Sequence, residues 1–410
     1  MPCLRHACRM LRLSLVAPAL ALGGLLPALP AQLRGGDVLV TDYSTDSVFV
    51  VSPSGAVGTL HTGLPLQGPS GIAVTAAHEV LVADYTSATL FRLPPGGGWT
   101  PVITGLRGPI RVAVDRNGDY LLTELSTAAL SRVTPAGVKT TIHAGAPFVR
   151  PFGIAVDGDG EYLVADDGAR ALFRVTAAGV STVHAGLPFR LPQGVTVMAD
   201  GDYAVMDGLA DALFVVPRAG GAINTLIATP TLGNPCAVTG DFEGRVLVSE
   251  SSAASNRVVA VDRFGALTVL AQGLPFANLE AVAKVPNLQG PPQGAWGQSH
   301  ALTLDLPTQA NRGYVMFAST SLHPGIPLGG GDPRGTPCNP DGLFFLSIGA
   351  SNAIFTGFSG VLSPSGQALA NLNLPALPLP PFTFFLQAFS VNFQSASTVG
   401  VFTNVHALRL

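Results

Sequence analysis

Short apolar runs that end in an acidic residue recur along the first two-thirds of the chain. The runs read VLVTD, VLVAD, YLLTE, YLVAD, YAVMD and VLVSE, and their acids are Asp42, Asp84, Glu124, Asp166, Asp207 and Glu250. Successive acids stand about 40 residues apart, a period that is typical of propeller blades when the units are strand-like. The spacing therefore predicts a β-propeller for this part of the chain.

Each repeat contains four short runs with the composition of β-strands. One unit opens with GIAV at Gly153–Val156, turns at Asp157–Gly160, and continues through the acid-ended run to LFRV at Leu172–Val175. A glycine turn and a fourth run, STVHAGLPF, complete this unit. Asp and Gly suit tight hairpin turns, so we expect four antiparallel strands per unit, which make one blade.

The first repeat lacks a strand that the last repeat can supply. Asp37–Leu64 provides three strands, and the missing opening strand follows the sixth unit as Leu279–Val285. Pairing of the two chain ends would close the ring and remove an exposed sheet edge. We therefore expect a six-bladed propeller over residues 35–288, closed by the chain ends.

The repeat stops at a segment rich in Gly, Pro and Gln. Residues 289–294 have the composition of a linker, and residues 295–410 contain alternating apolar runs separated by Gly, Pro and Ser. This second pattern predicts a β-sandwich domain. The whole chain is thus expected to be all-β.

Composition narrows the range of functions. The chain has 48 Gly, 34 Pro and only 11% charged residues, while 47% of its residues are hydrophobic, which argues against disorder. The formal net charge is −3, and no basic run alternates with aromatic residues. Nucleic acid is therefore not an expected partner.

The N-terminus has the layout of a secretory signal. Three arginines precede an apolar stretch from Leu13 to Leu29, and small residues follow. An uncleaved membrane anchor is the alternative, because about 17 apolar residues could just span a bilayer. Internal Pro and Gly residues weaken that alternative. We expect a signal peptide over residues 1–31, a secreted or extracytoplasmic protein, and no stable membrane insertion after cleavage.

The repeat resembles known propeller sequences. The segment Pro151–Asp166 follows the pattern P-x-G-I-A-V-D-x-x-G-x-Y-L-V-A-D. This pattern is similar to the NHL repeat, to the six-bladed gluconolactonase (senescence-marker-protein-like) family and, more distantly, to the streptogramin B lyases. The segment Gly357–Pro375 looks like a C-terminal domain found in secreted planctomycete proteins. The resemblance implies the propeller fold more strongly than any activity.

The repeated acids have a structural and a functional interpretation. Six nearly identical carboxylates could form a ring that holds cations, or each could accept hydrogen bonds from its own turn and tie one blade to the next. The structural interpretation suits a regular repeat better. The histidines His61, His143 and His184 occupy one repeat position on the outermost strand, so they cannot converge on one metal ion.

The residues that precede each opening strand are expected to surround one mouth of the central channel. Aligned by repeat, they are Ser70, Ile110, Phe152, Gln193, Asn234 and Glu280. A polar arc facing an apolar wall suits a small organic ligand, which predicts ligand-binding roles for Ser70, Arg111, Phe152 and Gln193. Ordinary polar lining in contact with channel water is the alternative.

The resemblance to gluconolactonases adds a metal to this mouth. It implies that Glu280 and Asn234 hold a divalent cation, with Ca²⁺ as the expected ion. Two features depart from the family pattern: a second carboxylate is missing, and Pro235 follows Asn234 in place of Gly. Arg111 also stands where other repeats have Gly, and it could pair with an anionic ligand or with a neighbouring acid.

Two cysteines follow the predicted signal peptide. Cys236 takes the apolar position held by Ile72 and Ile154 in other repeats, so we expect it to pack as a small hydrophobic residue. A disulfide with Cys338 is the alternative, although a central-strand position makes it awkward to form.

These observations favour a secreted binding or scaffold protein that uses the channel mouth for a small-molecule, carbohydrate or protein ligand. The alternative is a metal-dependent gluconolactonase-like hydrolase or a streptogramin-lyase-like lyase. A purely structural cell-surface component is a third interpretation. The single carboxylate at Glu280 and the lack of a nucleophile–base pair count against the enzyme.

Overall fold

The structure is a computed structural model that describes most of the chain. The described residues are 33–241, 244–252, 256–289, 298–319, 322–327, 335–338, 355–356, 358–374, 383–391, 399–402 and 406–409. The predicted signal peptide lies outside them, and so does the predicted linker apart from Gln289. Among the described residues, no helix has the length and hydrophobicity needed to cross a membrane.

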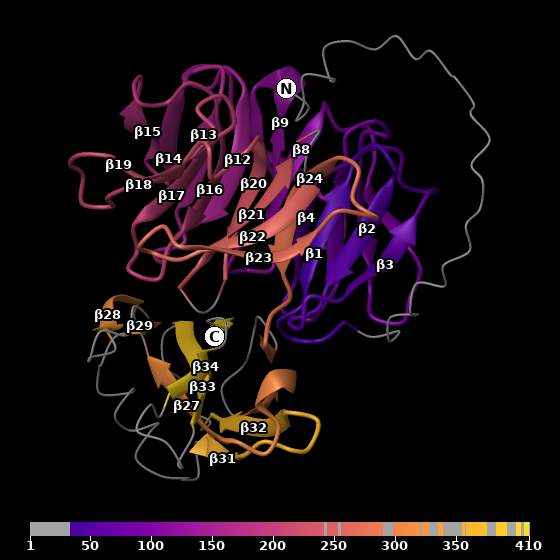
Figure 1. The fold of residues 1–410 in the computed structure, drawn as a ribbon, viewed down its shortest axis with the longest axis vertical. Helices are drawn as coiled ribbons and strands as arrows, with labels where there is room; N and C mark the ends of the chain where they lie inside the picture. Colours follow the sequence, from indigo (N-terminus) through magenta and orange to yellow (C-terminus); the bar gives the residue numbers. More distant parts are fainter. Residues whose placement is uncertain are drawn as a thin grey trace.

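Six four-stranded antiparallel sheets form the propeller (Figure 1). Blade 1 contains β24 (Leu279–Lys284), β1 (Val38–Asp42), β2 (Ser47–Val51) and β3 (Val57–Thr62). Blade 2 contains β4 (Pro69–Val74), β5 (Val80–Asp84), β6 (Thr89–Leu93) and β7 (Thr100–Ile103), and blade 3 contains β8 (Pro109–Val114), β9 (Tyr120–Glu124), β10 (Ala129–Val133) and β11 (Lys139–Ala144).

The remaining three blades repeat this order. Blade 4 contains β12 (Pro151–Val156), β13 (Tyr162–Asp166), β14 (Ala171–Thr176) and β15 (Gly179–Ala185). Blade 5 contains β16 (Pro192–Val197), β17 (Tyr203–Asp207), β18 (Ala212–Val216) and β19 (Asn224–Ala228), and blade 6 contains β20 (Pro235–Gly240), β21 (Val246–Ser251), β22 (Asn256–Val261) and β23 (Leu267–Gln272). The six-bladed propeller predicted from the repeat is confirmed.

The two ends of the propeller sequence close the ring. Strand β24 pairs antiparallel with β1, so that Val40 lies opposite Val282 and Val38 opposite Lys284. The apolar side chains of both strands are buried in one cluster that extends into blades 2 and 6. Closure by the chain ends is therefore confirmed, and it gives β1 a paired strand on both of its edges.

The repeated acids stabilise the connections between blades. Asp84 Oδ2 accepts the backbone N–H groups of Gln67 and Gly68 at 2.7 and 3.1 Å, in the segment that leads from blade 1 into blade 2. Its Oδ1 accepts the N–H and hydroxyl of Ser87 at 2.8 and 2.9 Å. Asp42 Oδ2 likewise accepts the N–H of Asn278 at 2.8 Å across the ring closure. The structural interpretation of these acids is confirmed.

The second domain is a sandwich of two sheets. One sheet has the order β25 (Leu288–Gln289), β26 (Ser299–Asp305), β32 (Gln367–Asn373), β30 (Phe355–Thr356). The other has the order β31 (Ser359–Val361), β27 (Gly313–Ser319), β33 (Thr383–Val391), β34 (Val399–Phe402), and β35 (His406–Arg409) also pairs with β33. A separate two-stranded sheet pairs β28 (Leu322–Pro327) with β29 (Gly335–Cys338). Leu304 and Leu372 of the first sheet pack with Met316 and Leu386 of the second, which confirms the predicted sandwich.

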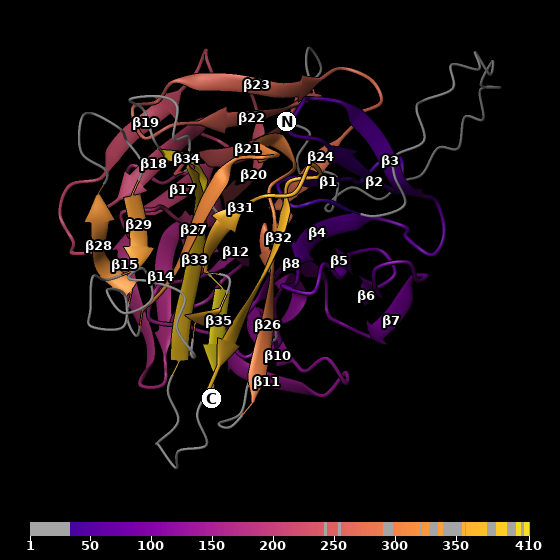
Figure 2. The ribbon, with the colours of Figure 1, turned by 90° about the horizontal axis from the view of Figure 1, so that it is seen from below.

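The sandwich packs against the propeller face at which the inner strands end (Figures 1 and 2). Arg34 forms a bidentate ion pair with Asp305, with distances of 2.9 Å to Oδ2 and 2.6 Å to Oδ1. The N–H of Gly35 donates to the same carboxylate at 2.9 Å. Farther round this face, the guanidinium carbon of Arg116 lies 4.9 Å from the centroid of the Phe385 ring. Contacts therefore join the two domains at two separated places.

Candidate functional site

Each inner strand begins with an irregularity in its pairing with the second strand of the blade. The register skips one residue there, as in a β-bulge, and the skipped residues are Ser70, Ile110, Phe152, Gln193, Cys236 and Glu280. Five of these six match the mouth positions expected from the sequence. In blade 6 the position belongs to Cys236, so the alignment of Asn234 with the other mouth residues was wrong by two positions.

Arg111 spans the mouth of the channel. Its Nη1 donates to the carbonyls of Ser70 and Ile110, and its Nη2 donates to the carbonyls of Cys236 and Glu280 at 2.9 and 3.0 Å. All four acceptors are bulge residues, and they belong to blades 2, 3, 6 and 1. We call these four oxygens the carbonyl ring. A planar guanidinium with five N–H donors suits such a ring, because it can bond to several acceptors at once.

The charged guanidinium of Arg111 is buried, with little access to solvent. Arg111 is 7% exposed and Glu280 is 1% exposed, and Arg111 Nη2 lies 3.9 Å from Glu280 Oε2. The guanidinium carbon also lies 4.9 Å from the centroid of the Phe152 ring. Burial lowers the pKa of Arg111 to about 10, while Glu280 opposes this shift. Arg111 therefore stays protonated at neutral pH and neutralises Glu280.

The other predicted mouth residues are engaged in bonds between blades. Ser70 is buried and donates its hydroxyl to the carbonyls of Ala83 and Pro109 at 2.9 and 3.0 Å, which links blade 2 to blade 3. Gln193 is buried as well, and its Nε2 donates to Asp167 Oδ2 at 3.0 Å. The mouth is thus a packed layer in which Ser70, Phe152, Gln193 and Glu280 are all inaccessible.

Asn234 lies outside this layer. It has a left-handed backbone with φ of 55°, its N–H donates to Asp211 Oδ1 at 2.8 Å, and its side-chain amide donates to the carbonyl of Ser251. A Ca²⁺ ion between Glu280 and Asn234 does not fit this arrangement, because Arg111 already supplies the positive charge beside Glu280. The metal assignment stays a prediction that a calcium titration can test.

Cys236 differs from its expected state. It is 1% exposed and takes the bulge position instead of the apolar position held by Ile72 and Ile154. The structure also has Cys236 in a disulfide bond, so the expectation of a packed thiol was wrong. The alternative of a disulfide with Cys338 stays a prediction, because the structure describes the backbone of Cys338 in β29 and not its side chain.

Asp167 is a buried acid at the mouth that the sequence analysis did not single out. Its carboxylate forms a bidentate pair with Arg150 at 2.6 and 2.5 Å and accepts the bond from Gln193. Burial raises the pKa of Asp167, against the influence of Arg150. A signal was present in the repeat, since the residue after the repeated acid is acidic only here; the others are Tyr43, Tyr85, Leu125, Gly208 and Ser251.

A second acidic group lies in the turn between β12 and β13. One oxygen each from Asp157, Asp159 and Glu161 lies within 4.8 Å of the others, which is compatible with a metal ion. Arg218 pairs with Asp157 at 3.6 Å and also with Asp159, while Arg174 lies 3.4 Å from Glu161. Asp157 Oδ1 accepts the N–H groups of Asp159 and Glu161, as in an ordinary Asx turn. Arginines thus provide the counter-charge here too.

The propeller lumen is a cavity of about 520 Å³. Arg111 and Gln193 line it near the starts of the inner strands, and Asp241 and Lys284 line it near their ends. The end beside Arg111 is closed by the carbonyl ring, and the sandwich packs against the face at the other end (Figure 2). A substrate that entered through the predicted mouth would first have to displace Arg111.

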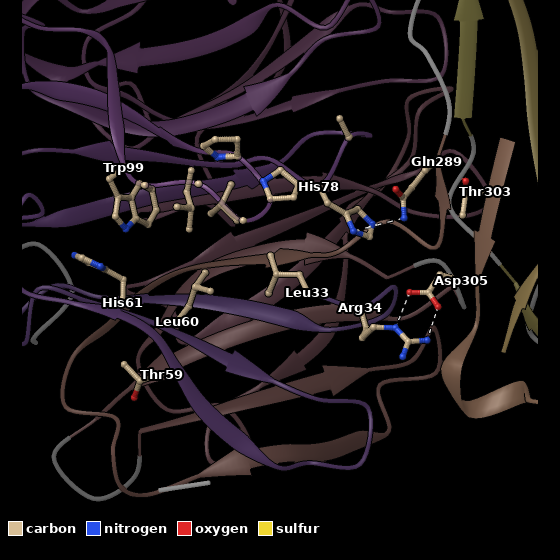
Figure 3. Close-up of a pocket in the computed structure, with 18 of the residues that line it drawn as sticks. Leu33, Arg34, Thr59, Leu60, His61, His78, Trp99, Gln289, Thr303 and Asp305 are labelled. Atoms are coloured by element: carbon tan, nitrogen blue, oxygen red, sulfur yellow. Dashed lines mark hydrogen bonds and ion pairs between the residues drawn. The ribbon is translucent and has the colours of Figure 1, made fainter. Parts of the chain in front are cut away.

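A larger cavity, of about 950 Å³, lies between blades 1 and 2 and the sandwich (Figure 3). We call it the interdomain groove. Trp99 and His61 lie at one end, where their rings meet at 68° with centroids 5.5 Å apart. Gln289, Thr303 and the Arg34–Asp305 pair lie at the other end. The sequence analysis missed this groove, because it is created only when the two domains pack together.

Comparisons with known proteins support the fold. Neither a protein-family model nor a curated protein matches this sequence. A streptogramin B lyase structure matches with 16% identity and a TM-score of 0.50, over 62% of this chain and 88% of the other. A chain of the nidogen–laminin complex matches with 17% identity and a TM-score of 0.53, over 61% and 98%.

A protein of unknown function from Bacteroides caccae also matches, with 14% identity and a TM-score of 0.51, over 61% of this chain and 99% of that protein. Identities this low show the fold alone. The matched share of about three-fifths of this chain corresponds in size to the propeller. The chain is therefore similar in fold to a streptogramin B lyase, a likeness that its repeat predicted, and to a chain of the nidogen–laminin complex, which the repeat did not suggest.

Proposed function

We propose that this chain is a binding protein built on a propeller with a closed centre, and not a metal-dependent hydrolase or lyase. The observation that carries the proposal is the Arg111 guanidinium in the carbonyl ring, paired with Glu280. An enzyme of the kind that the sequence resembles would use this position for its cation. A buried guanidinium there takes both the space and the charge that the cation would need.

Two further points support a binding role. One of the similar structures is a chain of the nidogen–laminin complex, so this fold does occur in a protein–protein assembly. The N-terminal sequence favours export, which would place the protein among extracytoplasmic ligands. The interdomain groove offers an accessible surface of mixed polarity, whereas five of the six predicted mouth residues are buried and the sixth, Asn234, is half-buried.

A calcium titration tests the proposal. The melting temperature of the purified mature protein is measured with and without Ca²⁺, for the wild type and for Glu280→Gln. We expect no shift in either, because Arg111 neutralises the carboxylate. A bound ion at a hundredfold excess over its Kd would stabilise the protein by about 2.7 kcal/mol, which is easily seen.

The variant Arg111→Gly provides the matched positive control. Removing the guanidinium leaves carbonyl oxygens and the Glu280 carboxylate facing one another, and these are the ligands that Ca²⁺ prefers. We expect this variant to gain a calcium-dependent stabilisation that the double variant Arg111→Gly/Glu280→Gln lacks. A wild type that is stabilised by Ca²⁺, with Glu280→Gln abolishing the effect, would overturn the proposal and restore the metal-dependent enzyme.

A further inference from the structure

We propose that the interdomain groove binds a neutral oligosaccharide chain. The inference rests on the proposed binding function, and it adds a ligand class and a location away from the channel mouth. The groove volume of about 950 Å³ lies at the upper end of the range for small-ligand sites, about 300–1,000 Å³. This size suits several linked sugar rings better than one small molecule.

One wall of the groove is apolar and held in position. It is formed by Leu60, Pro65, Leu93, Pro94 and Trp99. His61 fixes the indole through an edge contact, and His61 Nε2 is itself held 2.9 Å from the carbonyl of Gly63. A rigid aromatic surface binds with little loss of conformational entropy. A flat indole with a polar N–H matches the C–H face of a sugar ring and the hydroxyls at its edge.

The opposite end offers uncharged donors and acceptors. Thr303, Gln289 and Gln367 line the groove there, and hydroxyl and amide groups can each donate and accept hydrogen bonds, as sugar hydroxyls do. His78 lies beside them, with its Nε2 2.8 Å from the carbonyl of Pro286 and its Nδ1 3.5 Å from Gln289 Nε2. Burial lowers the pKa of His78, so that its ring is neutral at pH 7.

The charges in the groove cancel. Within the described part of the chain, the acidic and basic side chains that line it are Asp305 and Arg34, and they form a bidentate pair with each other. An anionic or cationic ligand would therefore gain no counter-charge while losing its hydration. A proline-rich peptide is also neutral and could lie on the apolar wall. It has few hydrogen-bonding groups to offer Thr303, Gln289 and Gln367, because proline lacks an N–H.

Isothermal titration calorimetry on the full mature protein tests the site. Cellohexaose, xylohexaose and mannohexaose serve as neutral oligosaccharide probes, and decaproline represents the competing class. We expect at least one hexasaccharide to bind. Trp99→Ala should weaken this binding by roughly tenfold or more, through the lost ring contact. Thr303→Val, which keeps the side-chain shape, should weaken it by a smaller factor.

Phe264→Ala is the matched control. Phe264 is an exposed aromatic residue, with 68% of its surface accessible, and it does not line the groove. The Phe264→Ala variant should leave the Kd for the oligosaccharide unchanged. The melting temperature of each variant checks that the fold is intact. If Trp99→Ala does not fold, Thr303→Val still tests whether the ligand binds in the groove.

Three results would overturn the inference: no binding of any of the three hexasaccharides, binding that both groove variants leave unchanged, or decaproline binding that depends on Trp99. Each of them is distinguishable from failure of the proposed function, which the calcium titration decides. If the protein binds neither sugar nor calcium, the proposed oligosaccharide site is refuted, whereas the proposal of a closed propeller centre still stands.

Discussion

The replacement Arg111→Met tests whether the guanidinium holds the centre of the propeller together. Methionine keeps an unbranched side chain of similar length but removes the charge and all five donors. Three consequences follow at the mouth: the four carbonyls lose their donor, the Glu280 carboxylate loses its counter-charge, and the Phe152 ring loses its cation.

The expected cost is large because both charged groups are buried. Arg111 and Glu280 are 7% and 1% exposed, so little water can replace the lost contacts. Breaking a buried ion pair by removing one partner costs about 3–5 kcal/mol. A typical domain is stable by only about 5–15 kcal/mol. For a propeller of this size, each kcal/mol corresponds to a fall in melting temperature of about 2–4 °C, so we expect the melting temperature to fall by roughly 6–20 °C.

The assay is chemical denaturation at pH 7, with a double-mutant cycle. Glu280→Gln alone leaves the guanidinium without its carboxylate and should also destabilise the fold. The double variant Arg111→Met/Glu280→Gln removes both charges and should recover part of the loss, with a coupling energy of about 1–3 kcal/mol. Ser54→Ala, on an exposed turn of blade 1, is the surface control. A fall below about 1 kcal/mol for Arg111→Met, or strictly additive variants, would refute a structural role for the pair.

Three other predictions follow from the same structure. Burial raises the pKa of the Asp37 carboxyl from 3.8 to about 6, so between these pH values the folded protein keeps a proton on Asp37 that the unfolded chain has lost. The free energy of unfolding should therefore fall by roughly 2–3 kcal/mol as the pH rises from about 4 to 6. Asp37→Asn should flatten this slope in denaturation measured at several pH values. Asp84→Asn and Asp166→Asn should each cost roughly 1.5–3 kcal/mol by denaturation, less what the amide recovers, and should leave the Kd of any groove ligand unchanged; unequal losses or altered binding would contradict their shared structural role. Deletion of residues 278–286 should unfold the propeller, because it removes Leu279, Val282 and Val285 from the core, and the burial of each contributes up to ~1.5–3 kcal/mol to stability. A soluble truncated protein that melts within a few degrees of the parent would refute closure by β24.

The repeat pattern was sufficient to predict the propeller. Local signals recur in every blade: the apolar inner strand, the Asp–Gly turn and the acid that ends the second strand. The acids Asp42 and Asp84 accept hydrogen bonds from the connecting segments, and this pairing follows from sequence-local geometry repeated at a fixed period. Closure was predictable too, because the missing strand of blade 1 had one candidate, Leu279–Val285.

The centre of the propeller was not predictable in the same way. Asn234 was aligned with Glu280, yet the bulge in blade 6 falls on Cys236, since the pairing register depends on the neighbouring strand and not on the sequence of one strand. Arg111 was recognised as a departure from Gly, but its partners are carbonyls from four blades. Backbone atoms carry no sequence signal, so only the assembled ring identifies them.

Local sequence thus determined which strands form and in what order, because blade geometry depends on contacts within about 40 residues. The tertiary structure decided which surfaces are accessible. It buried the predicted mouth around Arg111, and it created the groove by packing Trp99 of blade 2 opposite Thr303 of the sandwich. These residues are more than 200 positions apart in the sequence, and nothing in either segment alone specifies that their side chains line one cavity.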